Sequence, residues 1–415
     1  MKMIEITKDR FENFAKNNEY NNYCQTENYG MLMSKTGYKY NFVAYTTNDL
    51  EILAAGMFLT KKIGKYYYAY CPKGFIIDYQ DEDLVRRFTN NLKKYYKRKN
   101  IILLKINPEI DIATIDYKNN YERIINSNIN ILNNLKKLGF KKRKELEPLQ
   151  LLQPKLNAII DLKNYDANKL DKNIKNKINS SNTKGLELIK TDETKIDILY
   201  EFIKMYNDRD IDYYKELYNV FSKDNNIDFI LVKVDYKTYL INAKKKVEEE
   251  QEKNDKLNER LKKNTNDKNL NEKMESDKIL EEYKQDVIYA TQGLKKQEET
   301  YIAGAIVIKH NQKISILISG TDENYNYMYP NYFLHNQILE IYKKTYEIAD
   351  INCIADDFSE KSKFSKLNRF KFSFNPTIKE YIGELDLVIN NWKFKIIEKN
   401  SLLSNEFTKK KDTTK

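Results

Sequence analysis

A long stretch in the second half of the chain contains no residue that readily breaks a helix. Between Gly185 and Gly293 the sequence has neither glycine nor proline, and charged side chains are frequent over residues 236–296. Apolar residues recur in this stretch at alternating spacings of three and four, which is the repeat of a coiled coil. The repeat comprises two series, Leu240, Ala243, Val247, Leu257 and Leu261, with Asn254 in register, and then Leu280, Tyr283, Val287, Ala290 and Leu294.

A polar turn over residues 264–269 separates the two series. Two helices joined by such a short turn predict an antiparallel coiled-coil hairpin over residues 236–296. Each arm of ~25 residues would extend ~38 Å from its base. On these residues alone, a solvated helical spacer is at least as good an interpretation as a binding arm.

The sequence on both sides of this hairpin mixes strand and helix patterns. In the first part, β-type apolar runs fall at residues 42–45, 52–59, 66–70 and 101–106, with a helical pattern at 84–96. In the second part, strands are predicted at 156–162, 227–234, 302–309 and 313–319, and helices at 169–178, 196–206 and 331–349. The two parts repeat one arrangement, which favours an α+β fold with the hairpin inserted in the second part.

Composition and charge restrict the class of protein. A chain of 415 residues predicts two to three domains. Its net charge of +11 favours an anionic partner, such as tRNA, nucleotide-sugar phosphates or an anionic membrane face. The three cysteines are widely spaced, which supports neither a disulfide framework nor a zinc site and favours a reducing compartment. Residues 1–17 lack the apolar core of a signal peptide, and no apolar run approaches the ~20 residues that span a bilayer, so we expect a cytoplasmic protein.

Several enzyme classes are disfavoured by what the sequence lacks. It has neither GxxxxGK[ST] nor GxGxxG, so no nucleotide-phosphate loop is visible. His310 and His335 are the two histidines, which is a poor basis for a hydrolase triad or a histidine metal site. No Arg or Gln is followed by the glycine spacing with which acetyltransferases hold coenzyme A. We therefore expect no metal and no redox cofactor.

A run near the C-terminus carries a more specific signal. Phe370-Lys371-Phe372-Ser373-Phe374 is followed by Glu380-Tyr381-Ile382-Gly383-Glu384-Leu385-Asp386-Leu387 and Ile389-Asn390. This run resembles the C-terminal signature of the Fem family of peptidoglycan peptidyltransferases, which use aminoacyl-tRNA to build the interpeptide bridge of a cell-wall precursor. Further segments resemble the family in the same order, among them Gln25-Thr26, Tyr29-Gly30, Pro72-Lys73-Gly74, Asn107-Pro108-Glu109, Leu138-Gly139-Phe140, Gln153-Pro154-Lys155, Arg209-Asp210-Ile211-Asp212-Tyr213 and Pro330-Asn331-Tyr332.

The resemblance implies a specific architecture. The Fem family is built of two acetyltransferase-like (GNAT-like) domains, so we expect an α+β fold with two such mixed-sheet domains and the inserted antiparallel hairpin. Residues 1–153 and 380–403 would form the first domain, and residues 154–379 the second. Residues 236–296 would form the hairpin, and residues 404–415 a basic tail.

The resemblance also implies an activity. We expect tRNA-dependent transfer of an amino acid to the stem-peptide amine of a lipid-linked or UDP-linked muropeptide. Phe370-Lys371 matches the pair associated with the tRNA terminus and the transfer step. Arg209 and Tyr213, four residues apart, match positions that hold the diphosphate and sugar of the precursor. Lys175 and Lys177 match a basic helix and are candidates for tRNA phosphates.

Each of these residues also has a simpler interpretation. From spacing alone, Lys371 is an exposed strand lysine between core aromatics, Arg209 and Tyr213 are a surface pair, and Lys175 and Lys177 are solvated.

The sequence also departs from the family pattern. Met33 replaces a usual lysine, Asn107 a usual aspartate and Ile318 a usual tyrosine, and Ile354-Ala355-Asp356-Asp357 lacks the usual glycines. These departures keep two alternatives open. One is a non-catalytic Fem-like protein that scaffolds an active paralogue, and the other is an N-acyltransferase acting on another amine. Expected partners are aminoacyl-tRNA, a muropeptide precursor (lipid II or UDP-linked), the inner membrane surface, and a second copy or a paralogue in a dimer.

Overall fold

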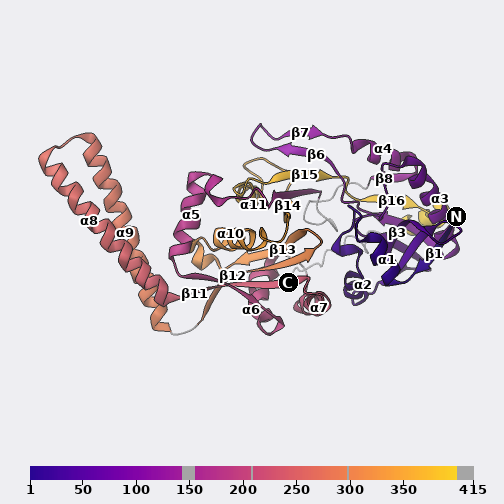
Figure 1. Cartoon of the computed structure of the whole chain (residues 1–415), viewed down its shortest axis with the longest axis horizontal. Helices are drawn as coiled ribbons and strands as arrows, with labels where there is room; N and C mark the ends of the chain where they lie inside the picture. The colour runs from indigo at the N-terminus through magenta and orange to yellow at the C-terminus, as the bar shows by residue number, and fades with distance from the viewer. Residues whose placement is uncertain (143–154, 207–208, 297–298, 400–415) are drawn as a thin grey trace.

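The computed structural model of this chain describes residues 1–142, 155–206, 209–296 and 299–399. Over these residues the backbone forms one seven-stranded and one nine-stranded sheet with helices packed on them (Figure 1). Two long helices project from the end of the molecule that lies beyond the nine-stranded sheet. This architecture confirms the predicted mixed α+β class. The motif Gln153-Pro154 and the tail 404–415 lie outside the described residues.

The seven-stranded sheet has the order β1-β2-β3-β4-β5-β16-β8. Its strands are β1 (Lys2–Ile6), β2 (Lys39–Thr46), β3 (Ile52–Ile63), β4 (Tyr66–Cys71), β5 (Ile101–Ile106), β8 (Phe140–Lys142) and β16 (Leu385–Val388). The helices of this half are α1 (Lys8–Ala15), α2 (Glu27–Ser34), α3 (Glu82–Arg98), α4 (Ile129–Lys137) and α12 (Asn391–Lys399). Neighbouring strands are antiparallel except β4 and β5, which are parallel and are joined by α3.

The nine-stranded sheet has the order β10-β11-β12-β13-β14-β9-β15-β6-β7. Its strands are β6 (Asp111–Asp116), β7 (Glu122–Ile125), β9 (Leu156–Asp161), β10 (Leu186–Thr191), β11 (Ile227–Val234), β12 (Thr300–His310), β13 (Lys313–Thr321), β14 (Ile348–Ile354) and β15 (Thr377–Tyr381). The helices here are α5 (Lys172–Thr183), α6 (Ile196–Ile203), α7 (Ile211–Ser222), α10 (Pro330–Tyr342) and α11 (Ser365–Phe372). Only β13 and β14 are parallel among its pairs, and α10 lies between them in the chain.

The two sheets exchange chain segments near both ends. β6 and β7 precede residue 153, yet they pair within the nine-stranded sheet through β15. In the opposite direction, the chain leaves the nine-stranded sheet after β15 and enters the seven-stranded sheet as β16, which lies between β5 and β8. The proposed domain boundaries stay a prediction, as does the kinship of both halves to acetyltransferases.

The helix predicted at 331–349 is wrong in its second half. α10 ends at Tyr342, and β14 begins at Ile348. Four of the seven residues of segment 348–354 are buried, and the segment pairs with both β9 and β13. Backbone pairing with two neighbours therefore overrides the helical spacing that continues in the sequence.

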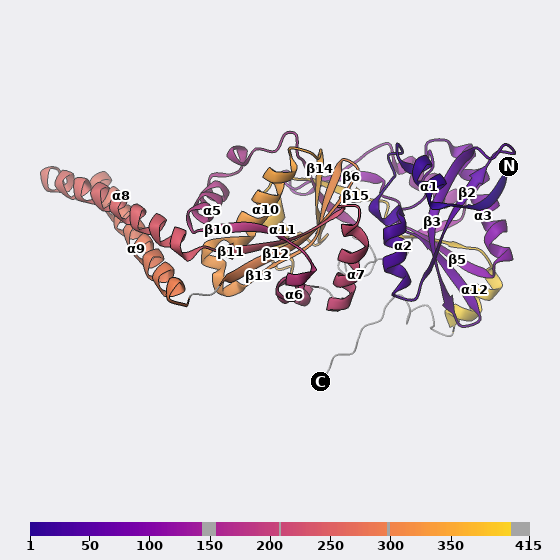
Figure 2. The ribbon, with the colours of Figure 1, turned by 60° about the horizontal axis from the view of Figure 1, so that its bottom comes forward.

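The two long helices are α8 (Tyr236–Lys263) and α9 (Asp267–Lys296). They lie side by side along their length and carry the two apolar series (Figures 1 and 2). Their bases enter the core of the nine-stranded half, where Tyr239, Ala243 and Ala290 are buried. Both glycines that bound the glycine-free stretch lie at this base. A Cβ on Gly185 would lie 2.3 Å from the Asp235 carbonyl oxygen, and one on Gly293 2.1 Å from the ring of Tyr236.

A buried polar group lies farther along the same pair of helices. Glu250, Asn254 and Ser276 are each less than one tenth exposed. The Asn254 amide donates to Ser276 at 3.2 Å, and the Ser276 hydroxyl donates to Glu250 at 2.6 Å. Because these side chains satisfy one another only in this alignment, they fix the register of the two helices.

Candidate functional site

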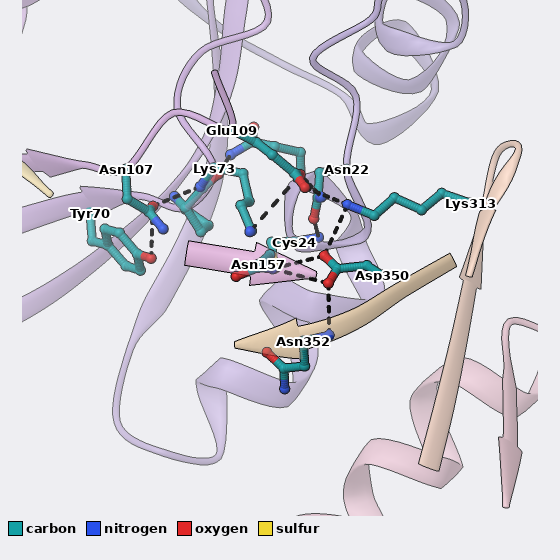
Figure 3. Close-up of polar contacts among 12 residues, drawn as sticks. Asn22, Cys24, Tyr70, Lys73, Asn107, Glu109, Asn157, Lys313, Asp350 and Asn352 are labelled. Atoms are coloured by element: carbon teal, nitrogen blue, oxygen red, sulfur yellow. Dashed lines mark hydrogen bonds and ion pairs between the residues drawn. The ribbon is translucent and has the colours of Figure 1, made fainter. Parts of the chain in front are cut away.

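A cluster of charged side chains lies where the two sheets meet (Figure 3). Lys73 follows β4, and Glu109 follows β5, so both come from the ends of neighbouring parallel strands of the seven-stranded sheet. Lys313 begins β13, and Asp350 lies on the neighbouring parallel strand β14. Asn157 on β9 completes the group, which we call the interface cluster. Two parallel strand pairs, one from each sheet, therefore supply the charged members of this cluster.

The members of the interface cluster are joined by ion pairs and hydrogen bonds. Lys313 Nζ pairs with Glu109 and lies 3.3 Å from Asp350 Oδ2. Lys73 Nζ lies 3.9 Å from Glu109 Oε2. The Asn157 amide donates to both oxygens of Asp350, at 3.1 and 2.9 Å. Each carboxylate is therefore held by a cation, an amide or both, which is the condition for burying charge at acceptable cost.

The pairing has a clear effect on protonation. Burial alone would raise the pKa of Glu109, but the charges of Lys313 and Lys73 outweigh it and lower that pKa to about 2. Burial pushes the pKa of Lys313 down, and the carboxylates of Glu109 and Asp350 raise it well above the ordinary lysine value. Both groups are therefore ionised at neutral pH.

A cavity of about 340 Å³ opens beside this cluster. It is lined by residues of both halves, among them Tyr23, Glu109, His310, Lys313, Lys379 and Tyr381. A smaller cavity of about 30 Å³ adjoins Lys73, Asn157, Asp350 and Asn352. The larger volume fits a small group or part of an extended chain and offers it both carboxylates and ammonium groups.

Asn107 lies next to the interface cluster, and its side-chain amide forms hydrogen bonds through its oxygen but not through its nitrogen among the described residues. Its oxygen accepts hydrogen bonds from the Tyr70 hydroxyl at 3.0 Å and from the Lys73 backbone N–H at 2.8 Å (Figure 3). Its amide nitrogen is buried without a hydrogen-bond partner among the described residues. An aspartate at this position would place a second acceptor oxygen there instead of a donor.

Lys371 lies in a helix and is buried, so its interpretation as an exposed strand lysine is wrong. It belongs to α11, is 7% exposed, and its ammonium donates to the Cys353 carbonyl at 2.7 Å. Burial lowers the pKa of Lys371 below the ordinary lysine value, although the charge of Asp350 opposes the shift. Since Cys353 and Asp350 are both on β14, this strand connects Lys371 to the interface cluster.

Aromatic rings surround the position next to Lys371. Phe370 contacts Tyr332, His335 and Phe374, with ring centroids 5.2, 4.8 and 5.4 Å away. Burial lowers the pKa of His335 to about 4, and the nearby charge of Lys371 acts in the same direction. The imidazole is therefore neutral at physiological pH.

The two candidate tRNA lysines lie on α5 and differ in their surroundings. Lys177 Nζ lies 4.9 Å from the centroid of the Tyr332 ring, and this ring packs edge-on against Phe370. Lys175 instead donates to the Asn168 carbonyl at 3.2 Å. The structure thus brings Lys177 into the surroundings of Phe370 and Lys371.

Arg209 and Tyr213 lie where α7 packs against α2. Arg209 precedes Asp210, the N-cap of α7, so it lies outside the helix that carries Tyr213. The Arg209 guanidinium carbon lies 4.6 Å from the centroid of the Tyr213 ring. Tyr213 and Tyr23 pack against the same apolar cluster, and Tyr23 also lines both cavities. Tyr213 therefore shares a cluster with a residue of the cavity lining, whereas neither Arg209 nor Tyr213 itself lines the larger or the smaller cavity.

Two of the positions noted above as departures from the family pattern lie on α2 and β13. Met33 is buried in α2, and Ile318 on β13 packs against the same apolar cluster as Tyr213. Both side chains therefore contribute to apolar packing.

Lys313, Asp350 and Asn157 have no signal in the sequence that would have identified them. Lys73 and Glu109 fall within quoted motifs, but their pairing with residues of the other sheet depends on the fold.

The comparisons with known proteins agree with this architecture. The sequence matches the FemAB family over residues 6–400. A protein of Staphylococcus epidermidis named lipid II:glycine glycyltransferase is 22% identical over 416 residues, which cover 96% of this chain and 95% of that protein. Its namesake in Staphylococcus aureus is 23% identical over 422 residues, with the same shares covered.

A solved structure resembles the whole fold. The crystal structure of FemX superposes with a TM-score of 0.73 at 20% sequence identity, covering 96% of this chain and 100% of that chain. At this level of identity the likeness shows the fold. Because the family match spans nearly the whole sequence, it confirms the resemblance, and this chain belongs to the FemAB family.

Proposed function

We propose that this protein transfers an amino acid from aminoacyl-tRNA to the stem-peptide amine of a peptidoglycan precursor. The observation that carries the proposal is the match over 95% of the length of proteins named lipid II:glycine glycyltransferase. A match over that length includes both sheets and the junction between them. A lipid-linked muropeptide is therefore the favoured acceptor, and a UDP-linked one carries the same peptide.

The chemistry requires little from the protein beyond orientation and charge. The acceptor amine attacks the ester carbonyl carbon of the aminoacyl-tRNA, a C–N bond forms, and the C–O bond to the ribose breaks. The amine loses a proton, and the ribose oxygen leaves as a hydroxyl group after taking one up. Negative charge develops on the carbonyl oxygen and then on the ribose oxygen, so a positioned donor lowers both barriers.

Lys371 has the surroundings that this role requires. Its ammonium is shielded from water, which strengthens its interaction with developing negative charge. The Cys353 carbonyl and the packing of Phe370 hold the helix end in place. We assign Lys371 the stabilisation of the oxyanion and of the leaving oxygen, and Phe370 the positioning of the lysine and of the tRNA terminus.

The remaining roles follow from charge. Arg209, with Tyr213 beneath it, suits the diphosphate and the sugar of the acceptor. The larger cavity suits the stem peptide, which carries carboxylates and an ammonium group for Lys313 and Glu109 to recognise. Lys177 is assigned to tRNA phosphate, and Lys175 remains a second candidate for the same contact.

The proposal is tested by amino acid transfer in vitro. Purified protein is incubated with a radiolabelled, charged tRNA pool and with lipid-linked or UDP-linked muropeptide. Labelled muropeptide is expected, and Lys371→Ala should lower the rate roughly 100-fold, as loss of one oxyanion donor typically does. Lys366→Ala is the matched control, because Lys366 lies exposed on the same helix.

A non-catalytic scaffold is the second candidate function. It is favoured by Asn107, which replaces the usual aspartate and leaves a buried amide nitrogen without a partner among the described residues. Binding of tRNA and muropeptide without any transfer, unchanged when Asn107 is converted to aspartate, would support the scaffold over the enzyme. Transfer to an amine other than the stem peptide would support a general N-acyltransferase.

A further inference from the structure

The single tryptophan of this chain lies exposed on the last helix. Trp392 on α12 is 71% exposed, and Ile396, one turn later on the same face, is 37% exposed. The opposite face of α12 is anchored, because Phe394 packs against a buried cluster that contains Ile63 and Tyr68. A large apolar side chain is thus presented to the outside on a helix whose other face is fixed.

Basic side chains lie on α12 and in the segments that it contacts. Lys393 reaches back over the Tyr66 ring, at 5.1 Å from its centroid, and donates to Asn100 at 3.1 Å. These contacts place α12 beside the turn between β3 and β4 and beside the end of α3. Exposed cations in these neighbouring segments and on α12 itself are Lys62, Lys65, Lys97, Arg98 and Lys395. The exposed side chain of Tyr67, which starts β4, adds an aromatic ring to this surface.

An exposed indole and an aliphatic neighbour, with exposed cations in the adjoining segments, match the requirements for contact with the interface of an anionic membrane. Tryptophan and tyrosine favour the headgroup level, and lysines around them attract anionic lipids. None of the helices in the described part of the chain has the length and apolarity needed to cross a bilayer. A surface contact of this kind is therefore a different mode of membrane association from a span.

We propose that the outer face of α12, centred on Trp392 and Ile396, docks on an anionic phospholipid surface. The charge of the surrounding lysines favours lipid over a neutral apolar partner, and the exposed indole and isoleucine favour lipid over nucleic acid. Figure 2 shows α12 at the end of the molecule opposite α8 and α9. Docking through α12 thus leaves the two long helices pointing away from this contact. The inference does not rest on the proposed transferase activity, since it concerns a surface outside the candidate site.

The single tryptophan makes the test specific to this site. Vesicles of equal parts phosphatidylglycerol and phosphatidylcholine should shift Trp392 emission to shorter wavelengths, and vesicles of phosphatidylcholine alone should not. Lys395→Ala should weaken vesicle binding about fivefold, because each cation near an anionic surface contributes on that order. Ile396→Glu should abolish the emission shift while Trp392 remains in place to report it. Raising the salt concentration should weaken binding.

A matched control distinguishes binding through α12 from nonspecific binding of exposed apolar residues to vesicles. Met274 is 62% exposed and lies on α9, far from α12. Met274→Glu should bind vesicles like the parent, and Ile396→Glu should keep the parent rate of transfer to a water-soluble acceptor. The proposal is overturned if Ile396→Glu binds vesicles as the parent does, or if free tRNA shifts Trp392 emission while anionic vesicles do not.

Discussion

Removal of Lys313 should expose how strongly the two halves depend on the interface cluster. Its ammonium lies between Glu109 and Asp350, whose side chains are 15% and 7% exposed, so Lys313→Met leaves two shielded carboxylates without their shared cation. The pKa of Glu109 lies at about 2, against an ordinary value of 4.5. At 1.36 kcal/mol for each pH unit, that difference corresponds to about 3 kcal/mol of stability at neutral pH. We expect Lys313→Met to lose about that much, consistent with the ~3–5 kcal/mol for breaking a buried pair.

Urea unfolding followed by circular dichroism measures the loss, and a surface pair supplies the control. Lys163 and Glu347 are 2.7 Å apart, but their side chains are 64% and 47% exposed. Lys163→Met should therefore cost at most about 1 kcal/mol. Glu109→Gln added to Lys313→Met should recover part of the loss, since it removes one of the two unpaired charges. If Lys313→Met is no more destabilising than Lys163→Met at neutral pH, the cluster does not have the energetic role assigned here.

The pH dependence gives the same prediction a second measurement. Because the folded-state pKa of Glu109 is depressed, its contribution is present above pH 4.5 and is lost as the pH falls towards about 2. The raised pKa of Lys313 means that its own contribution is present below pH 10.5 and is lost only at still higher pH. The difference in stability between the parent and Lys313→Met should thus shrink as the medium is acidified below pH 4.5. A difference that grows on acidification would contradict the assignment.

Three further perturbations test other parts of the molecule. Arg209→Ala should raise the KM for muropeptide about tenfold with little change in kcat, while Lys215→Ala, at an exposed position of the helix α7 that follows Arg209, should leave both constants unchanged. Equal constants for the two variants would remove Arg209 from the acceptor site. Replacing residues 248–282 with a short Gly/Ser linker should preserve the melting temperature, whereas replacing residues 239–294 should lower it, because the larger deletion removes Tyr239 and Ala290 from the core. Equal melting temperatures for the two variants would contradict the packing of the helix base. The folded state holds His335 neutral with a pKa of about 4, while the unfolded chain takes up a proton below pH 6.5, so the parent protein loses stability between pH 6.5 and 4. His335→Gln should make this loss smaller by about 3 kcal/mol, and an identical loss in the parent and in His335→Gln would contradict the burial of the imidazole.

The sequence was most informative where a pattern is local. The run without glycine or proline and its spacing of three and four predicted two long helices, and the ends of α8 and α9 lie within three residues of the expected ends. Family motifs located Lys371, Phe370, Arg209 and Tyr213 by order along the chain. Local pattern gave no account of the surroundings of these residues. The aromatic neighbours of Lys371 suggest a strand residue, yet Lys371 lies in the last turn of α11. The carbonyl that its ammonium contacts, that of Cys353, comes from β14.

The interface cluster could not be predicted because no segment contains more than a small part of it. Glu109 and Lys313 are separated by 204 positions in the sequence, and neither has a partner nearby in the chain that would mark it as buried. An isolated lysine or glutamate is ordinarily a solvated residue. Only the junction of two sheets makes these residues adjacent, and only burial makes their charges consequential.

The placement of β15 and β16 has a consequence for how the protein is made. β15 lies between β9 and β6, and β16 lies between β5 and β8, so residues 377–388 complete both sheets. During synthesis these residues leave the ribosome after every strand that they join. Neither half can close its sheet before residues 377–388 have emerged, which departs from the usual folding of domains one after another from the N-terminus. Until then the edges of β5 and β9 remain open to other nascent chains, so a stalled or C-terminally truncated product should be captured by chaperones or aggregate rather than yield a stable first domain.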